Sequence, residues 1–332
     1  MLVTGADGFI GSELICRLNS DGRIETKAAV RNASNHLPKE IEQFPLGQFD
    51  RDTNWYTALR GVNVIIHAAG RAHLTRDLAK DPIREFRRTN VEATLNLARQ
   101  AVIAGVRRFV FLSSVKVNGE GFLSIERPVT NSSLQHVAGS SSEFGIYKES
   151  DIPTPSDPYG VSKHEAEIGL RNLAEKTSME VVIIRPPLVY GPRVRANFLL
   201  LMRAVSKGIP LPFGAVNNRR SLVGLDNLID FILKCAEDEA AANHTFFVSD
   251  GQDLSTPELI RLLANAMNRP TRLIPVPASI LLSVGSLLGK RDEVQRLVGS
   301  LQVDITKARQ ILNWVPPFSL GEGLKRAVSH VI

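Results

Sequence analysis

Tyr159 and Lys163 have the residue types and the spacing that proton transfer requires. In the segment SDPYGVSKHEAE they stand four residues apart at the start of a predicted helix, so both side chains lie on one face. A phenol has an ordinary pKa of about 10, and a neighbouring ammonium favours the phenolate, which brings the phenol toward neutral pH. The pair predicts a general acid or base, and the lysine can also hold a cofactor ribose.

Two serines are expected near this pair. Ser113 and Ser114 follow the apolar run of VFLSSVKVNG, at the end of a predicted strand. The carboxyl ends of parallel strands line the ligand crevice of an open α/β sheet. The two hydroxyls are therefore predicted to lie in that crevice.

A glycine-rich turn opens the chain. LVTGADGFIG places Gly5, Gly8 and Gly11 after a predicted strand and before a predicted helix, with Phe9 and Ile10 inside the turn. Glycines allow a tight turn and let backbone N–H groups approach a pyrophosphate, and the helix N-terminus adds partial positive charge. The turn predicts a dinucleotide site.

The end of the second predicted strand bears on which dinucleotide binds. An acidic side chain there usually holds an unphosphorylated ribose. Here the strand KAAV ends in Arg31 and Asn32, whereas Glu25 stands at its beginning. Arg31 can meet a 2′-phosphate, which favours NADP over NAD, or it can stack on the adenine.

The elements that position these residues alternate between apolar runs and amphipathic segments. The pattern predicts an α/β protein with a Rossmann doubly wound parallel sheet over residues 1–187, and a smaller mixed α/β substrate domain over 188–332, with some exchange of chain between the two. The predicted strands are Leu2–Thr4, Thr26–Val30, Val62–Ala68, Arg108–Leu112 and Val181–Arg185, and the predicted helices are Gly11–Asn19, Ile83–Ala104, Tyr159–Lys176, Asn197–Lys207, Leu225–Glu237, Thr256–Met267 and Ile305–Leu312.

Composition narrows the class of protein. The 332 residues are 43% hydrophobic and 22% charged, which excludes a disordered polyelectrolyte or a disulfide-stapled module. The net charge of +6 admits nucleic acid, a membrane surface or a small anionic ligand. No basic run interleaved with aromatic residues favours nucleic acid.

Targeting and metal signals are not expected. The chain shows no signal-peptide pattern, and the apolar stretch Ala278–Leu288 is shorter than the ~20 residues of a membrane span. Cys16 and Cys235 are far apart without Cys/His ligand spacing, so no metal is expected and the location is predicted to be a reducing cytoplasm. The Ser- and Gly-rich segment Asn131–Ile146 predicts a surface loop, either a lid or an idle insertion.

Five motifs together resemble a known family. They are TGADGFIG, HAAG at His67–Gly70, SSVKVNG, YGVSK, and RPPLVYGP at Arg185–Pro192. In this order they resemble an extended short-chain dehydrogenase/reductase of the NAD(P)-dependent nucleotide-sugar epimerase/dehydratase family, and the likeness runs from Met1 to VDITKARQILNWVPPFSLGEGL. The resemblance implies a UDP-sugar substrate and a homodimer formed through the helices at Ile83–Ala104 and Tyr159–Lys176.

The resemblance also implies a role for each matching residue. Tyr159 would be the acid/base, Lys163 its electrostatic partner, and Ser114 the hydrogen-bond partner of the reacting hydroxyl. Asn90 would lie near the active site and cofactor, with a hydrogen bond inside its own helix as the alternative. The expected cofactor contacts are Gly5, Gly8, Phe9, Ile10, Gly11, Arg31, Gln48, Phe49, Ala68, Ala69, Gly70, Asn90 and Lys163, although an Asp is commoner than Gln48.

Substrate contacts are expected from the second half. Asn197 and Arg220 match positions that hold the nucleotide diphosphate, and the planar fork of an arginine suits phosphate oxygens. Arg291 and Arg296 are weaker candidates, because their spacing to Asp304 fits poorly and ordinary solvated arginines explain them as well.

One difference from the family pattern argues against a dehydratase. Sugar-nucleotide 4,6-dehydratases carry an acidic pair directly after the catalytic Ser/Thr, whereas this chain has Val115 and Lys116. HAAGRAH, SSVKVNGE, RPPLVYGP and NRRSLVGLDNL most resemble a bacterial subgroup associated with surface-polysaccharide clusters. That resemblance implies one of two C4 reactions: reduction of UDP-4-keto-6-deoxy-N-acetylglucosamine to UDP-N-acetylquinovosamine, or 4-epimerisation of UDP-glucose or UDP-N-acetylglucosamine with recycled NAD. Arg31 and Lys116 favour the reductase.

Two other classes of protein remain as alternatives. A carbonyl reductase acting on a lipid or flavonoid-like ketone would share the N-terminal half but would not need Asn197 and Arg220. A dinucleotide-sensing protein without catalysis would have no reason to keep Ser114, Tyr159 and Lys163 together.

Overall fold

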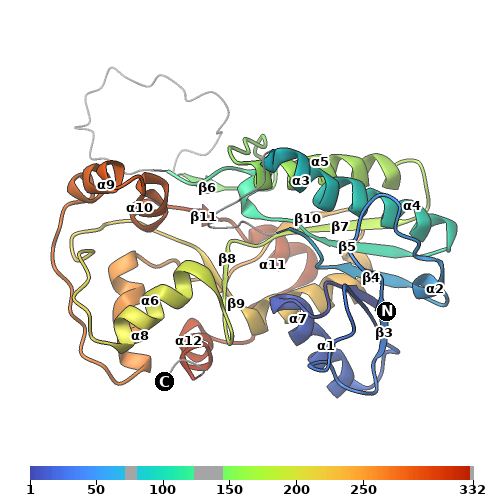
Figure 1. The fold of residues 1–332 in the computed structure, drawn as a ribbon, viewed down its shortest axis with the longest axis horizontal. Helices are drawn as coiled ribbons and strands as arrows, with labels where there is room; N and C mark the ends of the chain where they lie inside the picture. The colour runs from blue at the N-terminus through green and yellow to red at the C-terminus, as the bar shows by residue number, and fades with distance from the viewer. Residues whose placement is uncertain (72–80, 123–144, 330–332) are drawn as a thin grey trace.

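A seven-stranded sheet forms the centre of the molecule (Figure 1), and all its strands are parallel. The computed structural model describes residues 1–71, 81–122 and 145–329. The strand order is β10-β7-β5-β4-β1-β2-β3. The strands are β1 (Leu2–Thr4), β2 (Lys27–Val30), β3 (Glu42–Pro45), β4 (Val64–His67), β5 (Arg108–Leu112), β7 (Glu180–Arg185) and β10 (Thr245–Phe247). The predicted α/β doubly wound fold is confirmed.

Helices cover both faces of this sheet, which explains why its inner strands are apolar along their length. One hydrophobic core lies between the sheet and α1 (Phe9–Asp21), α7 (Leu225–Glu237) and α11 (Thr306–Leu312). The other face packs against α2 (Tyr56–Leu59), α4 (Ala93–Ile103) and α5 (Pro158–Ala174). The strand order reverses beside β1, which pairs with both β2 and β4, and ligands bind at such a point in open sheets.

The helix predicted at Ile83–Ala104 is three consecutive pieces. They are α3 (Pro82–Arg87), a π-helical turn η1 (Arg88–Glu92) and α4. π-turns widen the helix by one residue and are frequent at functional sites. Asn90 lies in this turn and is fully buried.

A second layer of helices lies beside the sheet, at the lower left of Figure 1. Helices α6 (Ala196–Ser206), α8 (Thr256–Ala266) and α12 (Leu320–Val328) share a third core with the two-stranded sheet β8 (Leu188–Tyr190) and β9 (Leu222–Gly224). Helices α9 (Ala278–Leu287) and α10 (Arg291–Val298) pack on each other, and β6 (Ile146–Tyr147) pairs with β11 (Gln302–Val303). Two 3₁₀ turns complete the description, η2 (Val115–Val117) and η3 (Glu239–Ala241).

The chain after residue 187 contributes to both layers. Strand β10 extends the large sheet beside β7, and α7 and α11 cover one of its faces. Strand β3 and the two small sheets have no counterpart in the sequence expectations, because each is short and β3 is partly exposed. Residues 131–144 of the predicted Ser- and Gly-rich loop lie outside the described residues, and Ile146 starts β6.

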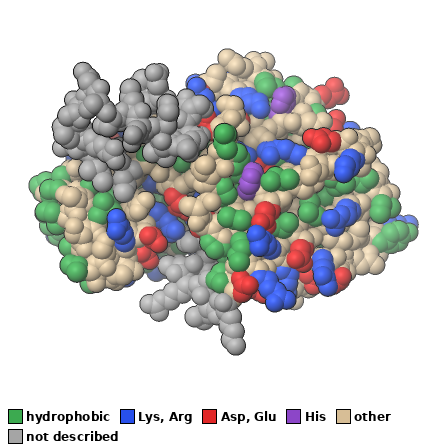
Figure 2. Space-filling view, turned by 90° about the horizontal axis from the view of Figure 1, so that it is seen from above, with side chains coloured by type: hydrophobic (Ala, Val, Ile, Leu, Met, Phe, Trp, Pro, Cys, Tyr) green, Lys and Arg blue, Asp and Glu red, His purple; other side chains and the backbone are tan. Residues whose placement is uncertain are grey.

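Charged side chains of both signs are interspersed on the face shown in Figure 2. The surplus of +6 is therefore not gathered into one basic patch on that face. Within the described ranges, no helix has both the length and the apolar character needed to cross a membrane.

Candidate active site

The glycine turn brings three backbone segments into direct contact. Gly5 has φ of +64°, and a Cβ on it would lie 2.8 Å from the backbone of Ala69, just after β4. A Cβ on Gly11 would lie only 2.1 Å from the Gly5 carbonyl oxygen. No larger residue fits either position without moving the backbone.

This turn fits a pyrophosphate. Helix α1 starts after Gly8 with neither a side-chain cap nor an acidic residue in its first turn. The first N–H groups of the helix therefore have no intrahelical partner and no competing carboxylate. The residues that would hold a dinucleotide here are Gly5, Gly8, Phe9, Ile10 and Gly11, next to Ala68, Ala69 and Gly70.

The end of β2 presents an exposed arginine. Arg31 follows the last strand residue, and its carbonyl accepts a hydrogen bond from Gly47 N at 3.0 Å. Gln48 is exposed beside it, but the Phe49 ring is buried edge-on against Trp55, with centroids 4.8 Å apart. Sequence reasoning expected both residues to contact adenine; the Phe49 ring belongs to the core, so only its backbone remains for that contact.

A buried histidine ends β4. The His67 ring lies between the hydroxyls of Thr4, 2.7 Å from Nδ1, and Thr94, 2.9 Å from Nε2. Burial, helped by the Lys163 ammonium, lowers the pKa of His67 to about 3. The imidazole is neutral, and the Thr4 hydroxyl also accepts from Ala69 N at 3.2 Å, so this group sets the path of the backbone after β4.

Asn90 joins that backbone to the tyrosine helix. Its Oδ1 accepts from Arg71 N at 2.7 Å, and its Nδ2 donates to Arg71 O at 3.1 Å and Ser162 Oγ at 3.0 Å. The bonds are tertiary, which corrects the alternative of a bond inside its own helix. Both ends of the amide are engaged within the protein, so Asn90 supports the cofactor strip rather than offering a free group to it.

Ser114, Tyr159 and Lys163 come together at the carboxyl end of β5. Tyr159 lies in the first turn of α5, and the Ser114 hydroxyl is close enough to its phenol to lower the pKa of that phenol. Lys163 Nζ donates to the Leu112 carbonyl at 2.8 Å. A Cβ on Gly70 would lie 3.4 Å from Lys163 Nζ, so the lysine reaches the strip predicted to underlie the cofactor.

The start of α5 is held by a charged cap. Asp157 Oδ1 accepts from Gly160 N at 2.7 Å, and its other oxygen pairs with Lys116 Nζ. Lys116 also contacts Glu120 at 2.7 Å. Lys116 thus fixes the tyrosine helix in place, and its charge is matched by two carboxylates. It therefore gives no independent support to a reductase.

Burial dominates the titration of the two catalytic candidates. Desolvation, followed by the Asp157 carboxylate, raises the pKa of Tyr159 to about 12, while the Ser114 hydroxyl acts in the opposite direction. Desolvation lowers the pKa of Lys163 to about 8, opposed by Glu167. Sequence reasoning expected the ammonium to bring the phenol toward neutral pH; desolvation and the Asp157 carboxylate instead raise the pKa of the phenol, which holds its proton at pH 7.

A buried ion pair below this site was missed by sequence reasoning. Glu167, on α5, accepts from Ser113 Oγ at 2.5 Å and pairs with Arg185 Nη2 at 2.5 Å and with Arg171 at 2.9 Å. Glu167 stands four residues after Lys163, so the helical spacing could have placed it on the same face. Its partner Arg185 ends β7, which spacing within the helix cannot reveal.

The predicted substrate residues differ in burial and in their contacts. Arg220 is half-buried and donates to the carbonyls of Arg296, at 2.7 Å, and Gly299, at 3.0 Å. Desolvation lowers the pKa of Arg220 to about 10, opposed by Glu120. Arg296 lies 3.5 Å from Glu120, so the structure groups it with Arg220 although its spacing made it a weak candidate.

The other two candidates are exposed. Asn197 is in the first turn of α6, directly after Ala196, whose φ of +55° is unusual for a residue with a Cβ. Arg291 is exposed at the start of α10. Neither makes a contact that assigns it a role.

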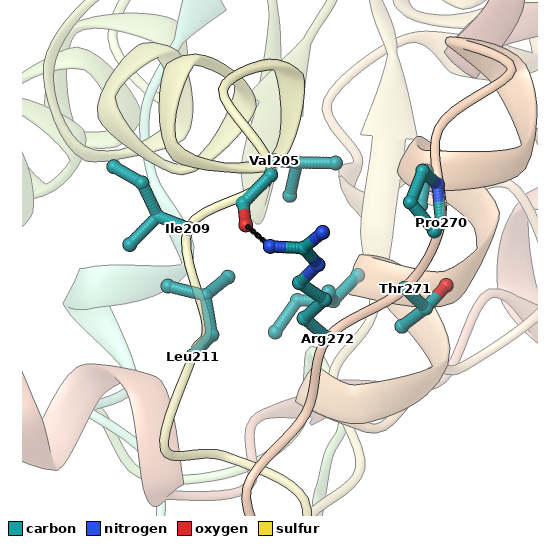
Figure 3. Close-up of a pocket in the computed structure, with 9 residues that line it drawn as sticks. Val205, Ile209, Leu211, Pro270, Thr271 and Arg272 are labelled. Atoms are coloured by element: carbon teal, nitrogen blue, oxygen red, sulfur yellow. Dashed lines mark hydrogen bonds between the residues drawn. The ribbon is translucent and has the colours of Figure 1, made fainter.

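A separate pocket lies between α6 and α8, away from these residues (Figure 3). Its lining is mainly aliphatic and includes Val205, Ile209 and Leu211. Arg272 crosses it and donates to the Gly208 carbonyl at 3.4 Å. The pocket contains none of the residues predicted to act.

The parallel sheet, glycine turn and Ser–Tyr–Lys set define an extended short-chain dehydrogenase/reductase. The chain belongs to the NAD dependent epimerase/dehydratase family, whose model matches residues 1–248. It is 45% identical over 327 residues to a UDP-glucose 4-epimerase from Vibrio cholerae, covering 98% of this chain and 93% of that protein.

More distant relatives share the full length. An N-acetyl-alpha-D-glucosaminyl-diphospho-ditrans,octacis-undecaprenol 4-epimerase from Escherichia coli O157:H7 is 26% identical, over 99% of this chain and 94% of that protein. The crystal structure of UDP-glucuronic acid 4-epimerase from Bacillus cereus in complex with NAD has a TM-score of 0.76 at 20% identity, over 99% and 97% of the two chains. That likeness is one of fold.

Proposed function

We propose that this enzyme transfers hydride at C4 of a UDP-linked sugar, reducing UDP-4-keto-6-deoxy-N-acetylglucosamine to UDP-N-acetylquinovosamine for surface polysaccharide. The observation that carries the proposal is the convergence of Ser114, Tyr159 and Lys163 at the carboxyl end of β5, where desolvation raises the pKa of the Tyr159 phenol. A phenol that keeps its proton at neutral pH is ready to act as a general acid. The Vibrio cholerae relative, named for UDP-glucose, supports a UDP-sugar as substrate.

Each residue then has a defined task. Tyr159 donates its proton to the sugar O4, and Ser114 orients that oxygen through a hydrogen bond. Lys163 supplies positive charge one helical turn away and stabilises the phenolate that remains. A bound nicotinamide dinucleotide supplies the hydride in this reaction. Elimination of water is not part of the proposal, because Val115 is apolar and Lys116 is held by Asp157 and Glu120.

Arg31 supports NADP(H) as the cofactor of this reductase. It is exposed at the end of β2, where a carboxylate would favour an unphosphorylated ribose. A dissociable NADPH suits a reaction that uses one hydride per turnover. Gln48, rather than an aspartate, lies beside this position and adds no negative charge there.

The second candidate is 4-epimerisation of UDP-glucose or UDP-N-acetylglucosamine. The name of the Vibrio cholerae relative, at 45% identity, favours it. The same three side chains would serve, with Tyr159 taking the proton from O4 and later returning it. The two candidates differ in whether the dinucleotide is consumed.

The proposal extends to the setting of the enzyme. We place it in the cytoplasm as a homodimer whose interface includes α4 and α5. Ile103 and Ile168, on these helices, are exposed in the single chain, and pairing would cover them. A division into a cofactor part, residues 1–187, and a substrate part, residues 188–332, is likewise part of the proposal.

Incubation of the purified enzyme with UDP-4-keto-6-deoxy-N-acetylglucosamine and either NADPH or NADH tests the choice of reaction. We expect stoichiometric loss of absorbance, with NADPH preferred. Arg31→Asp should weaken NADPH binding about 10-fold while leaving NADH binding unchanged or better, because it removes a partner of the 2′-phosphate. Arg203→Asp, an equal charge change on the exposed face of α6, is the control.

Two results would contradict the reductase. One is no oxidation of either dinucleotide together with interconversion of UDP-N-acetylglucosamine and UDP-N-acetylgalactosamine without added cofactor, which would establish the epimerase. The other is turnover of a ketone lacking UDP with no effect of Arg220→Ala, which would favour a carbonyl reductase.

A further inference from the structure

Glu167 and Arg185 form an ion pair that is closed to solvent. Their relative exposures are 0% and 1%. Arg185 Nε donates to Glu167 Oε1 at 2.9 Å and Nη2 to Oε2 at 2.5 Å, so both carboxylate oxygens are engaged by one guanidinium. Such a pair is costly to bury, because both ions lose their hydration, and a well-packed apolar pair often gives equal stability.

The pair connects every element that carries a catalytic candidate. Glu167 lies on α5, one turn beyond Lys163, and accepts from Ser113 Oγ, the neighbour of Ser114 at the end of β5. Arg185 ends β7, and its Nη1 donates to Asn118 Oδ1 at 2.9 Å, just beyond η2. The strand end with Ser114 is thereby bonded directly to the helix with Tyr159.

Glu167 also affects the titration of Lys163. Its carboxylate raises the pKa of Lys163, against the effect of burial. The His67 imidazole, whose pKa the ammonium lowers, is neutral at pH 7, and so is the Tyr159 phenol, one helical turn from Lys163 on α5. Arg185 and Arg171 hold the pKa of Glu167 below its ordinary value, against desolvation, so the carboxylate is charged.

We propose that Glu167 is a positioning residue for catalysis, which fixes Ser114 against Tyr159 through Ser113 and places a carboxylate one helical turn from Lys163. The inference rests on the proposed function for its kinetic consequences. Its electrostatic consequence, at Lys163, can be measured without any substrate.

The test is Glu167→Gln, with Glu180→Gln as the matched control. Glu180 pairs with the buried Arg108 across the same two strands, β5 and β7, but at their opposite ends. Both substitutions remove a carboxylate from a buried arginine. Only Glu167 contacts the catalytic region.

We expect Glu167→Gln to lower kcat about 100-fold with little change in KM, because the reacting groups lose their alignment. The alkaline limb of the pH profile of kcat should move about one unit to lower pH, because the ammonium loses an opposite charge. Titration of Lys163 by NMR of lysine-labelled apo-protein should show the same downward movement. Glu180→Gln should lower Tm but change neither kcat nor the pKa of Lys163.

Two further variants keep the proposal testable if Glu167→Gln does not fold. They also separate the alignment of Ser114 from the electrostatic effect on Lys163. Glu167→Asp keeps the charge and should restore the Lys163 titration more fully than kcat. Ser113→Ala leaves the ion pair intact and should lower kcat about 10-fold with the alkaline limb in place, which tests the tether even if Glu167→Gln does not fold.

The outcomes are distinct. An unchanged Lys163 titration in Glu167→Gln, or equal effects of Glu167→Gln and Glu180→Gln on kcat, would overturn the positioning role. If the wild-type enzyme turned over no UDP-sugar, the proposed function would fail, while the NMR titration would still decide whether Glu167 sustains the Lys163 charge.

Discussion

Strands β5 and β7 carry a buried arginine at each end of their pairing, and the two arginines serve different purposes. At the amino end, Arg108 pairs with Glu180 at 2.7 Å and donates to the carbonyls of Cys235, Ala236 and Asp238, at distances from 2.6 to 3.2 Å. These carbonyls belong to the last turn and end of α7, where helix groups lack partners and a cation is favourable. Arg108 therefore closes a helix.

At the carboxyl end, Arg185 is committed to Glu167 and Asn118, below the catalytic side chains. The neighbouring groups are polar or titratable: Ser113, Lys163 and the neutral His67. Burial disfavours the charged forms of Lys163 and His67, yet both titratable residues are present at this edge of the sheet.

The two arginines show that the amino edge of the sheet serves stability and that the carboxyl edge serves the proposed chemistry. The same ion pair chemistry stabilises a helix end at one edge and aligns reacting groups at the other. Variants at the amino edge should change the free energy of unfolding, whereas variants at the carboxyl edge should change rates or the pH dependence.

The largest effect is expected at the carboxyl edge from Tyr159→Phe. Removing the phenol hydroxyl deletes the proton donor, which should lower kcat about 1,000-fold. Binding of the dinucleotide, measured by fluorescence titration, should stay close to wild type. Tyr56→Phe, at an exposed residue of α2, is the control and should have no effect. Full turnover by Tyr159→Phe would remove the proposed mechanism.

The next largest effect is expected at the amino edge from Arg108→Met. The change leaves carbonyls of α7 without a donor and Glu180 without its buried partner, which should lower the free energy of unfolding by about 3 kcal/mol. Urea unfolding measures this loss, and kcat of the folded fraction should be unchanged.

Arg107→Ala provides the control for Arg108. Arg107 also contacts Glu180, at 3.1 Å, but its side chain is exposed. Its loss should change stability by less than about 1 kcal/mol. Equal losses from both variants would mean that the caps on α7 contribute nothing.

The smallest effect concerns acid stability at the carboxyl edge. His67 binds a proton at its ordinary pKa of 6.5 in the unfolded chain but only at about 3 in the folded protein. The unfolded state therefore binds more protons below pH 6.5, and the free energy of unfolding falls as the pH decreases, by about 2 kcal/mol at pH 5.

Urea unfolding at pH 7.5 and pH 5 checks this slope. His67→Gln should lose less stability than wild type between the two values, and His36→Gln, which alters an exposed ring, should behave like wild type. An identical slope in wild type and His67→Gln would show that the buried imidazole does not drive the acid loss.

Local patterns predicted much of the site. Tyr159 and Lys163 share a face because a helical turn places residues four apart together, and Gly5 and Gly11 mark a turn that no side chain fits. Ser114 could be placed because a strand end has a definite position in a parallel sheet. These inferences need only neighbours along the chain.

Predictions about which charged and titratable side chains are available for chemistry were less accurate. Lys116 looked like an available cation but is held by Asp157 and Glu120, and two backbone carbonyls accept hydrogen bonds from Arg220. Tyr159 was expected to titrate toward neutral pH, and burial moves it the other way. Charge count along a sequence does not reveal which charges are paired or desolvated.

The sequence alone determined the fold class and predicted where the glycine turn and Ser114, Tyr159 and Lys163 lie in it, because these depend on short-range spacing and on the order of strands and helices. The tertiary structure decided which arginine closes α7 and which pairs with Glu167 beside the candidate catalytic groups. Arg108 meets Cys235 across 127 residues, and Arg185 meets Asn118 across 67. Contacts of that separation are selected by burial, where an unpaired charge is costly, and burial exists only once the chain has folded.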